Sequence, residues 1–185
     1  MMTRLRVLGS VLLLSAAAAL TNAPYAMAAS RQELDRDATQ ALESLYAKNT
    51  AARLLGEKAR AVLVFPSIVK AGFMFGGQIG EGVLLKGGKP AAYYNSVAAS
   101  YGFQAGVQVF GYALFFMNDA ALAFLDSSDG WELGVGPSIV VVDAGVGKSL
   151  TSTTITQDVY AFIFDQKGLM GGIGVQGSKI TRISK

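Results

Sequence analysis

The sequence predicts an α+β protein built mainly from antiparallel β-strands, with helices on the N-terminal side and one short helix inserted later. Two observations support this fold class. From Ala61 onward, short apolar runs alternate with glycines, which is typical of antiparallel strands. Ten glycines fall between Gly72 and Gly111, and glycine inside a strand marks a bulge or a sharp bend. We therefore expect a strongly curved sheet, or a small barrel-like or sandwich core.

The stretch Tyr101 to Met117 is the element around which the other strands should be arranged. Every second residue, counted from Tyr101, is apolar or glycine, which predicts an extended strand with one buried face. The alternate positions begin with glycine and glutamine and become apolar from Phe110 onward. The second half of this strand should therefore be covered by protein on both faces or face another apolar medium.

The first 28 residues predict a cleaved signal peptide. Arg4 and Arg6 precede an apolar run from Val7 to Leu20, and Ala26-Met27-Ala28 gives the small-x-small cleavage pattern. A retained transmembrane helix is the alternative, but the run of about 14 residues is shorter than the roughly 20 that span a bilayer. We expect residues 29–185 to form a single domain in the periplasm or outside the cell. Since the sequence has no cysteine, a lipoprotein anchor is not expected.

Two helices are predicted next. Ser30-Arg31-Gln32-Glu33 is a capping box, and an apolar stripe recurs at helical spacing from Leu34 to Leu45. Asn49-Thr50 should start a second, shorter helix that ends near Gly56 or Ala59. We expect both helices to cover the sheet, and membrane insertion is the alternative.

The strands are predicted in short pieces. Ala61 to Phe65 should be stopped by Pro66. A hairpin from Phe73 to Leu85 should be interrupted at Gly76-Gly77 and closed at Gly87-Gly88. Ala91 to Met117 supplies one or two strands, depending on a break near Asn95-Ser96.

The C-terminal third continues this pattern. Asn118 should cap a short helix from Ala120 to Leu125. The strands expected after this helix are Trp131 to Val141, Thr151 to Thr156, Val159 to Phe164 ending by Gly168, and Met170 to Ile183.

Candidate chemistry is sparse. The absence of histidine and cysteine excludes the common nucleophilic triads and nearly every zinc site, so we expect no enzyme, no cofactor and no metal. Gly145-Val146-Gly147-Lys148-Ser149 lacks the first glycine of a phosphate-binding loop, and Gly172 to Gly177 matches a dinucleotide motif without the helix that the motif must open. We interpret them as a hairpin turn and a glycine-rich strand.

The charge balance argues against nucleic-acid binding. Without Arg4 and Arg6 the chain keeps 14 basic and 13 acidic side chains, a net charge of +1, and it has no run of five basic residues. Glu81 shares its parity with Ile79 and Val83. We expect a bulge at Gly80 or Gly82 to turn Glu81 outward; if it points inward it needs a cationic partner, for which Lys70 is a candidate.

From Ala59 to Ile183 the sequence resembles the SYLF domain family, most closely its short, secreted bacterial members. The resemblance rests on these segments: Ala59 to Pro66, Lys70 to Phe73, Gly76 to Gly82, Tyr101 to Gln108, Gly134 to Pro137, Val159 to Phe162, Lys167 to Gly172 and Gln176 to Ile180. It implies a single lipid-binding domain with affinity for phospholipid or phosphatidylinositol lipids. Some eukaryotic members also bind actin, which an exported protein would rarely meet.

We therefore expect a non-enzymatic protein of the cell envelope that docks on anionic phospholipid. The expected basic and aromatic rim consists of Arg53, Lys58, Arg60, Lys70, Phe73, Phe75, Lys86 and Lys89. One alternative is a carrier of a lipid or apolar ligand, in a cavity lined by Phe110, Phe115, Phe116 and Phe162. Another is a structural component that binds a partner protein through an exposed strand edge.

Overall fold

The computed structural model describes residues 29–127, 131–132, 136–142, 150 and 154–185. The elements follow in the order α2 (Arg31–Lys48), α3 (Thr50–Lys58), β1 (Ala61–Lys86), β2 (Lys89–Phe116), α4 (Asp119–Ser127), β3 (Trp131–Glu132), β4 (Ile139–Val141) and β5 (Val159–Ile183). The strands form one sheet in the order β1-β2-β5-β3, and β4 also pairs with β5. All pairings are antiparallel except β4 with β5. The chain is thus an α+β protein with a strongly curled, mainly antiparallel sheet, as predicted.

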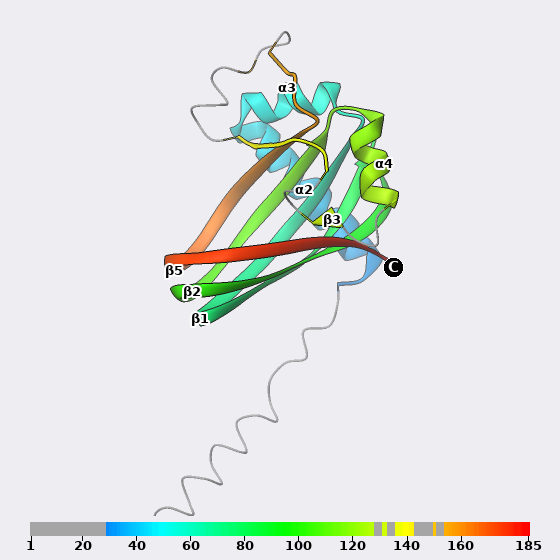
Figure 1. The fold of residues 1–185 in the computed structure, drawn as a ribbon. Coiled ribbons are helices and arrows are strands. Elements are labelled where there is room, and N and C mark those ends of the chain that lie inside the picture. Colours follow the sequence, from blue (N-terminus) through cyan, green and yellow to red (C-terminus); the bar gives the residue numbers. More distant parts are fainter. Residues whose placement is uncertain (1–28, 128–130, 133–135, 143–149, 151–153) are drawn as a thin grey trace, which may run out of the picture.

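Three very long strands carry the architecture, and each one bends back on itself (Figure 1). β5 runs from the end near α3 to the tip at the left of the picture and returns to the C-terminus at the right. β2 and β1 follow the same path beneath it. We call the bend the corner, the half of the sheet that includes Ala61 and Phe116 the first arm, and the half that includes Lys86 and Lys89 the second arm.

The backbone at the corner explains why glycine is frequent there. In β1 a Cβ added to Gly72 would lie 2.7 Å from the Cα of Gly76, so the strand turns within four residues. Met74, between them, has a positive φ of 62°. Gly106 in β2 and Gly168 in β5 have φ values of 139° and 89°, which side chains with a Cβ rarely adopt.

β1 takes the inside of the bend. Phe73 pairs with Ala105 and Phe75 pairs with Tyr101, so β2 advances four residues where β1 advances two. β2 and β5, in contrast, stay paired without a shift from Val109 to Tyr93. Because β2 and β5 take a longer path around the corner than β1, the two arms lie farther apart at β2 and β5 than at β1.

The inner face of the bent sheet forms one of two hydrophobic clusters. Here the arms of β1 contact each other, because a Cβ on Gly82 would lie 2.6 Å from the Phe65 ring and one on Gly80 would lie 2.8 Å from Cγ1 of Ile68. The cluster combines residues of both arms with Leu125 of α4, and its largest members are Leu63, Phe65, Ile68, Leu84, Tyr94, Phe110, Tyr112, Leu114, Phe116 and Ile180.

The outer face is covered by α2 and α3 at the end away from the corner. The apolar stripe of α2, which consists of Leu34, Ala38, Leu42 and Leu45, is buried against the sheet together with Leu55 of α3. The rings of Phe115 and Phe162 meet edge to face, with centroids 5.3 Å apart. Phe110 to Phe116 is buried on both faces, which confirms that prediction.

The predicted helix starts are confirmed. Glu33 N–H donates to Ser30 Oγ (3.3 Å) and Ser30 N–H donates to Glu33 Oε2 (2.9 Å), which completes the capping box. The side-chain oxygens of Asn49 and Asn118 accept from the backbone N–H groups of Ala52 (3.0 Å) and Ala121 (2.8 Å).

The predicted strand breaks are wrong. β1 continues through Pro66, where a register shift between Phe65 and Ile68 lets the proline interrupt the ladder without ending it. β1 also passes Gly76-Gly77. At Asn95-Ser96, where one or two strands were expected, β2 continues without a break, so the single strand is correct. β5 passes Gly168, whose positive φ serves the bend.

Two further strand predictions are changed. Of Trp131 to Val141, only β3 and β4 are strands in the described residues, and residues 133–135 lie outside them. Residues 151–153 also lie outside, as does the loop 145–149, and residues 154–158 are not a strand. There the backbone N–H groups of Thr156 and Gln157 donate to the Tyr160 hydroxyl (3.1 and 3.3 Å) instead of to a neighbouring strand.

Glu81 points the other way from the prediction. The register of β1 is unbroken from Phe75 to Leu84, so no bulge turns Glu81 away from the face of Val83. Its carboxylate is half-buried and pairs with Lys185, not with Lys70, at an N–O distance of 2.7 Å. The need for a cationic partner is met by the residue that follows the far end of β5, which sequence spacing did not suggest.

Candidate functional site: an apolar corner

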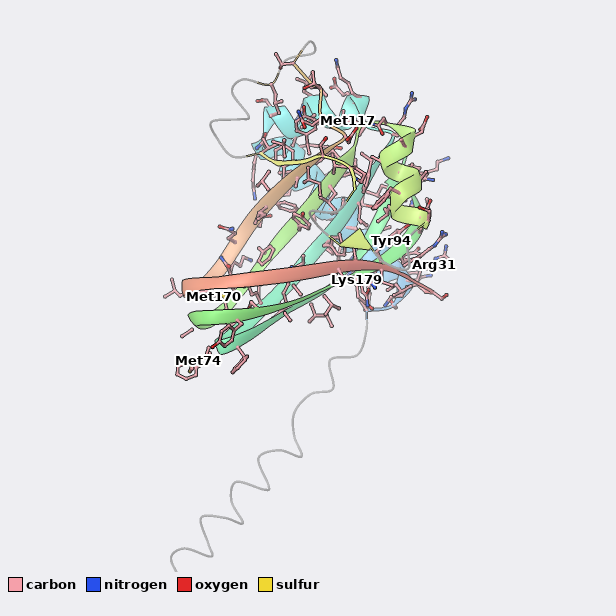
Figure 2. The ribbon with its side chains drawn as sticks, in the orientation of Figure 1. Arg31, Met74, Tyr94, Met117, Met170 and Lys179 are labelled. Carbon is pink, nitrogen blue, oxygen red and sulfur yellow. The ribbon has the colours of Figure 1, made fainter. Side chains whose placement is uncertain are left out.

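The corner presents large apolar side chains to the outside. Phe73, Phe75 and Leu169 are 77%, 70% and 88% exposed. Met74, Tyr101 and Val107 are also exposed and belong to the same bend of β1 and β2. Figure 2 shows Met74 and Met170 at the tip of the bent sheet, far from Met117 at the other end. Soluble proteins rarely expose so many apolar side chains together without a binding role.

The strand register gathers these residues on one face. Phe75 pairs with Tyr101, and their ring centroids are 5.0 Å apart. Val107 pairs with Leu169. The paired residues Phe73, Phe75, Tyr101, Val107 and Leu169 lie on the outer face, in line with the residues that α2 covers farther from the corner. The helices do not reach the corner, so its outer face stays open (Figure 1).

This arrangement corrects the prediction for the first half of the central strand. The apolar parity from Tyr101 to Val107 was expected to be buried, yet Tyr101, Ala105 and Val107 are exposed. Gln108, at one of the alternate positions, lines a pocket on the inner side of the bend. An apolar parity identifies a face that avoids water, but it does not say whether protein or another apolar medium covers that face.

The charged residues in the three strand segments that form the corner are all lysines. The segments 66–80, 96–109 and 166–180 contain Lys70, Lys167 and Lys179 and no acidic residue. Lys167 and Lys179 are exposed and pair with Val109 and Val97 on the outer face, and Lys179 also pairs with Glu132 of β3. The corner therefore combines an apolar surface with a positive local charge, although the chain as a whole is nearly neutral after its first 28 residues.

The structure splits the predicted rim into two groups. Lys70, Phe73 and Phe75 lie at the corner, whereas Arg53, Lys58 and Arg60 lie on or just after α3. From Ala61 to Phe73 the strand runs for twelve residues, about 40 Å of contour at the usual rise per residue. Lys86 and Lys89 flank the β1–β2 turn, which lines a hollow with α3 and so belongs to the helix end.

The helix end is less suited to an anion than the corner. Its hollow has a volume of about 600 Å³, and its charged lining residues are Glu43, Glu57 and Arg53. The guanidinium of Arg60 lies 3.7 Å from the Asp119 carboxylate, and that of Arg53 donates to the Tyr46 carbonyl. Acidic side chains therefore reduce the positive charge that Arg53 and Arg60 bring to the helix end.

Lys70 and the two phenylalanines also separate, onto opposite faces. Lys70 lies on the inner side of the bend, in a pocket that it shares with Gln108, and the phenylalanines lie on the outer face. The sequence already indicated this separation, because residues 70 and 73 are three positions apart and so point to opposite faces of a strand. The prediction missed Tyr101, Val107, Leu169, Lys167 and Lys179, which only the pairing of the strands brings to the corner.

Comparison with known proteins identifies the family. Residues 97–185 match the family model described as Ysc84: Las17-binding protein actin regulator. This region belongs to the SYLF family. Comparison with curated proteins gave no match. The SYLF match covers the corner segments of β2 and β5, with Tyr101, Lys167 and Leu169, but not β1.

The four phenylalanines expected to line a cavity are divided between the two hydrophobic clusters of the structure. Phe115 and Phe162 belong to the outer cluster, whereas Phe110 and Phe116 belong to the inner one. These four rings therefore do not line one common cavity. Within the described ranges, no helix combines the length and apolar character needed to cross a membrane, and no three potential metal ligands gather in one place.

Proposed function

We propose that this protein is a non-enzymatic component of the cell envelope that docks reversibly on anionic phospholipid by inserting the corner of its bent sheet. The observation that supports this proposal most directly is the exposure of Phe73, Phe75 and Leu169 at one tip, on strand segments that contain lysines and no acidic residue. The SYLF assignment is compatible with a lipid-binding role.

The magnitudes are sufficient for reversible binding. Moving one such side chain from water into an apolar phase contributes about 1.5–3 kcal/mol when burial is complete. A lysine near an anionic surface adds about 1 kcal/mol. Three inserted side chains and the exposed Lys167 and Lys179 outweigh the cost of bringing the protein to the surface, although the binding stays salt-sensitive.

Co-sedimentation of the purified protein with vesicles tests the proposal. We expect binding to vesicles that contain phosphatidylglycerol and weaker binding to pure phosphatidylcholine. Replacing both Phe73 and Phe75 by Ser should weaken binding at least about tenfold, since most of the inserted apolar area is lost. Lys167→Gln with Lys179→Gln should remove much of the preference for anionic vesicles.

The helix end supplies the matched control. Arg53→Gln with Lys58→Gln removes the same charge from the protein but leaves the corner intact. If this pair weakens vesicle binding as much as the corner pair does, the corner is not the docking site. Fractionation of cells and N-terminal sequencing of the exported protein test the envelope location and the expected removal of residues 1–28.

Binding of a partner protein is the second candidate function. β4 pairs with β5 at Val159 to Ala161 and β3 pairs with it at Lys179 and Ile180. Between these points, no other strand in the described part of the chain pairs with that edge of β5. An open edge of this kind can add a strand from another protein. The family description names an actin regulator, so a salt-independent pull-down with a protein partner would favour this function.

A further inference from the structure

The corner of the bent sheet contains two of the three methionines that follow residue 28. They are Met74 of β1 and Met170 of β5, and the third is Met117, which follows β2. Figure 2 shows Met74 and Met170 at the tip of the sheet and Met117 at the opposite end. Met74 is 46% exposed, whereas Met117 and Met170 are half-buried. Because the sequence has no cysteine, these three side chains contain all the sulfur after residue 28.

Met74 occupies a strained position where β1 turns. It lies between Phe73 and Phe75, where the pairing with β2 shifts its register, and its φ is 62°. In the same bend, β2 and β5 place glycines, Gly106 and Gly168, at positive φ. The Cβ of methionine makes such a backbone unfavourable, so glycine would be the easier choice in β1 as well. A side chain that is retained at a strained position often has a functional role.

Oxidation changes a methionine from an apolar side chain into a polar one. With hydrogen peroxide, a lone pair of the thioether sulfur forms a bond to one peroxide oxygen while the O–O bond breaks. The departing hydroxide takes the proton of the transferred oxygen, so the products are the sulfoxide and water. The sulfur loses two electrons, which the peroxide gains. The sulfoxide oxygen accepts hydrogen bonds from water, and these are lost when it enters an apolar phase.

Exposure decides which methionine reacts first, because the oxidant must reach the sulfur. Met74 is the most exposed of the three, so its sulfoxide should form before those of Met117 and Met170. The adjacent Phe73 and Phe75 are exposed at the same tip. A polar group at Met74 would therefore lie within the apolar surface that the proposed docking inserts.

We propose that Met74 is an oxidation site that regulates docking: a peroxide converts it to the sulfoxide, which weakens the attachment of the corner to the lipid surface. This inference rests on the proposed function, because it names a way to regulate the same surface. Phe73 and Phe75 keep their rings, so binding is weakened and not abolished. The expected loss is about tenfold, which corresponds to removing roughly one apolar side chain from the inserted area. Methionine sulfoxide reductases reverse the step.

The first experiment measures oxidation in solution, without vesicles. The purified protein is treated with hydrogen peroxide, and mass spectrometry of its peptides gives the rate of sulfoxide formation at each methionine. Met74 should react at least about threefold faster than Met117, as expected from their exposure. A smaller difference, or none, would overturn Met74 as the preferred oxidation site.

The second experiment measures co-sedimentation with phosphatidylglycerol vesicles before and after peroxide treatment. Each variant is compared with its own untreated form, so any effect of the substitution on docking itself cancels. We expect the treated wild type to bind about tenfold more weakly and treated Met74→Leu to change by less than about twofold. Incubation of the treated wild type with both methionine sulfoxide reductases, one for each sulfoxide epimer, should restore binding.

Met117→Leu is the matched control. It removes a thioether from the end of the sheet opposite the corner, where Met117 packs against the outer cluster. Its binding to vesicles should match that of the untreated wild type and should fall about tenfold after peroxide treatment, as that of the wild type does. Circular dichroism shows whether each treated and untreated protein is folded.

The regulation would be overturned by a loss of less than about twofold in the treated wild type, a larger loss in treated Met74→Leu, or protection by Met117→Leu. The two proposals can fail separately. A protein that does not sediment with vesicles would overturn the docking and its regulation, while the rates at Met74 and Met117 still decide whether Met74 is an oxidation site. Docking that depends on Phe73 and Phe75 but does not respond to peroxide would contradict the regulation alone.

Discussion

Lys185 donates a hydrogen bond from Nζ to Oε2 of Glu81 over 2.7 Å, and a second one to the backbone carbonyl of Ala29 over 2.8 Å. The Lys185 side chain is only 10% exposed and that of Glu81 is 28% exposed. One ammonium group therefore joins the second arm of β1, the start of α2 and the segment that follows β5.

Replacing either Glu81 or Lys185 alone should lower the free energy of unfolding more than replacing both. Glu81→Leu leaves the Lys185 ammonium poorly solvated without its counter-charge, and we expect a loss of about 1–3 kcal/mol in the free energy of unfolding. The double variant Glu81→Leu with Lys185→Met should recover most of this loss. Urea unfolding of the four proteins measures the coupling. Additive losses would show that the two residues act independently.

Close contact between the arms of β1 should make Gly80 intolerant of a side chain. A Cβ there would lie 2.8 Å from Cγ1 of Ile68 and 2.9 Å from the carbonyl oxygen of Ser67. Gly80→Ala should therefore destabilise the protein by about 1–3 kcal/mol, as overpacking does elsewhere. Gly77→Ala is the control, because its Cβ would meet only the Ala98 carbonyl at 3.9 Å. Similar unfolding midpoints for both variants would contradict the contact.

Asp158 should contribute stability that is lost in acid. Hydrogen bonds from Ser138 and Asn118 hold the pKa of this carboxyl below its usual value. Because the folded-state pKa is lowered, the contribution is present above the usual pKa near 4 and disappears as the pH falls through the folded-state value. Asp158→Asn should reduce the unfolding free energy at neutral pH by up to about 1 kcal/mol.

The test for Asp158 is the difference between the wild-type and variant curves of unfolding free energy against pH. This difference should shrink toward zero below about pH 4. A difference that stays constant down to low pH would show that the carboxylate charge contributes nothing.

Tyr112 should produce the opposite trend in alkali. Burial raises the pKa of its hydroxyl to about 12. The unfolded chain ionises near pH 10, so the folded form binds more protons between these values, and the unfolding free energy falls by about 1.4 kcal/mol per pH unit from this group. Tyr112→Phe should have a flatter dependence between about pH 10 and 12. Identical slopes for the two proteins would contradict a protonated, buried hydroxyl.

Local chemistry in the sequence was enough to predict the helices and their starts. Ser30, Asn49 and Asn118 each carry a side chain that can satisfy free backbone donors, and each one caps the helix that was expected to follow it. The density of glycine likewise predicted a sharply bent sheet.

Strand boundaries could not be predicted, because a glycine that bends a strand looks like a glycine that ends one. Pro66, Gly76 and Gly168 were interpreted as ends, yet the pairing with β2 continues across all three. The energy that decides between these outcomes comes from neighbouring strands far away in the sequence. The strand ends therefore cannot be located from one sequence until the pairing of the strands is known.

The candidate site was predicted only in part, again because the sequence does not show which strands pair. Phe73 and Phe75 were selected as aromatic residues near a lysine, and they lie at the exposed tip. Leu169 is separated from them by more than ninety positions in the sequence. Only the pairing of β1 with β2 and of β2 with β5 brings it to the same face of the sheet. Arg53 was grouped with them although it lies at the far end of the strands, since sequence spacing does not measure distance in a sheet.

The continuity of β2 through both arms has a consequence for attempts to dissect the molecule. The family match starts at Val97, in the middle of this strand. A fragment trimmed to that boundary would lack α2, β1 and Tyr94, which shield Phe115 on one side and Leu114 on the other. We expect such a fragment to be insoluble, because the boundary that is visible in sequence comparison divides a single cooperative unit.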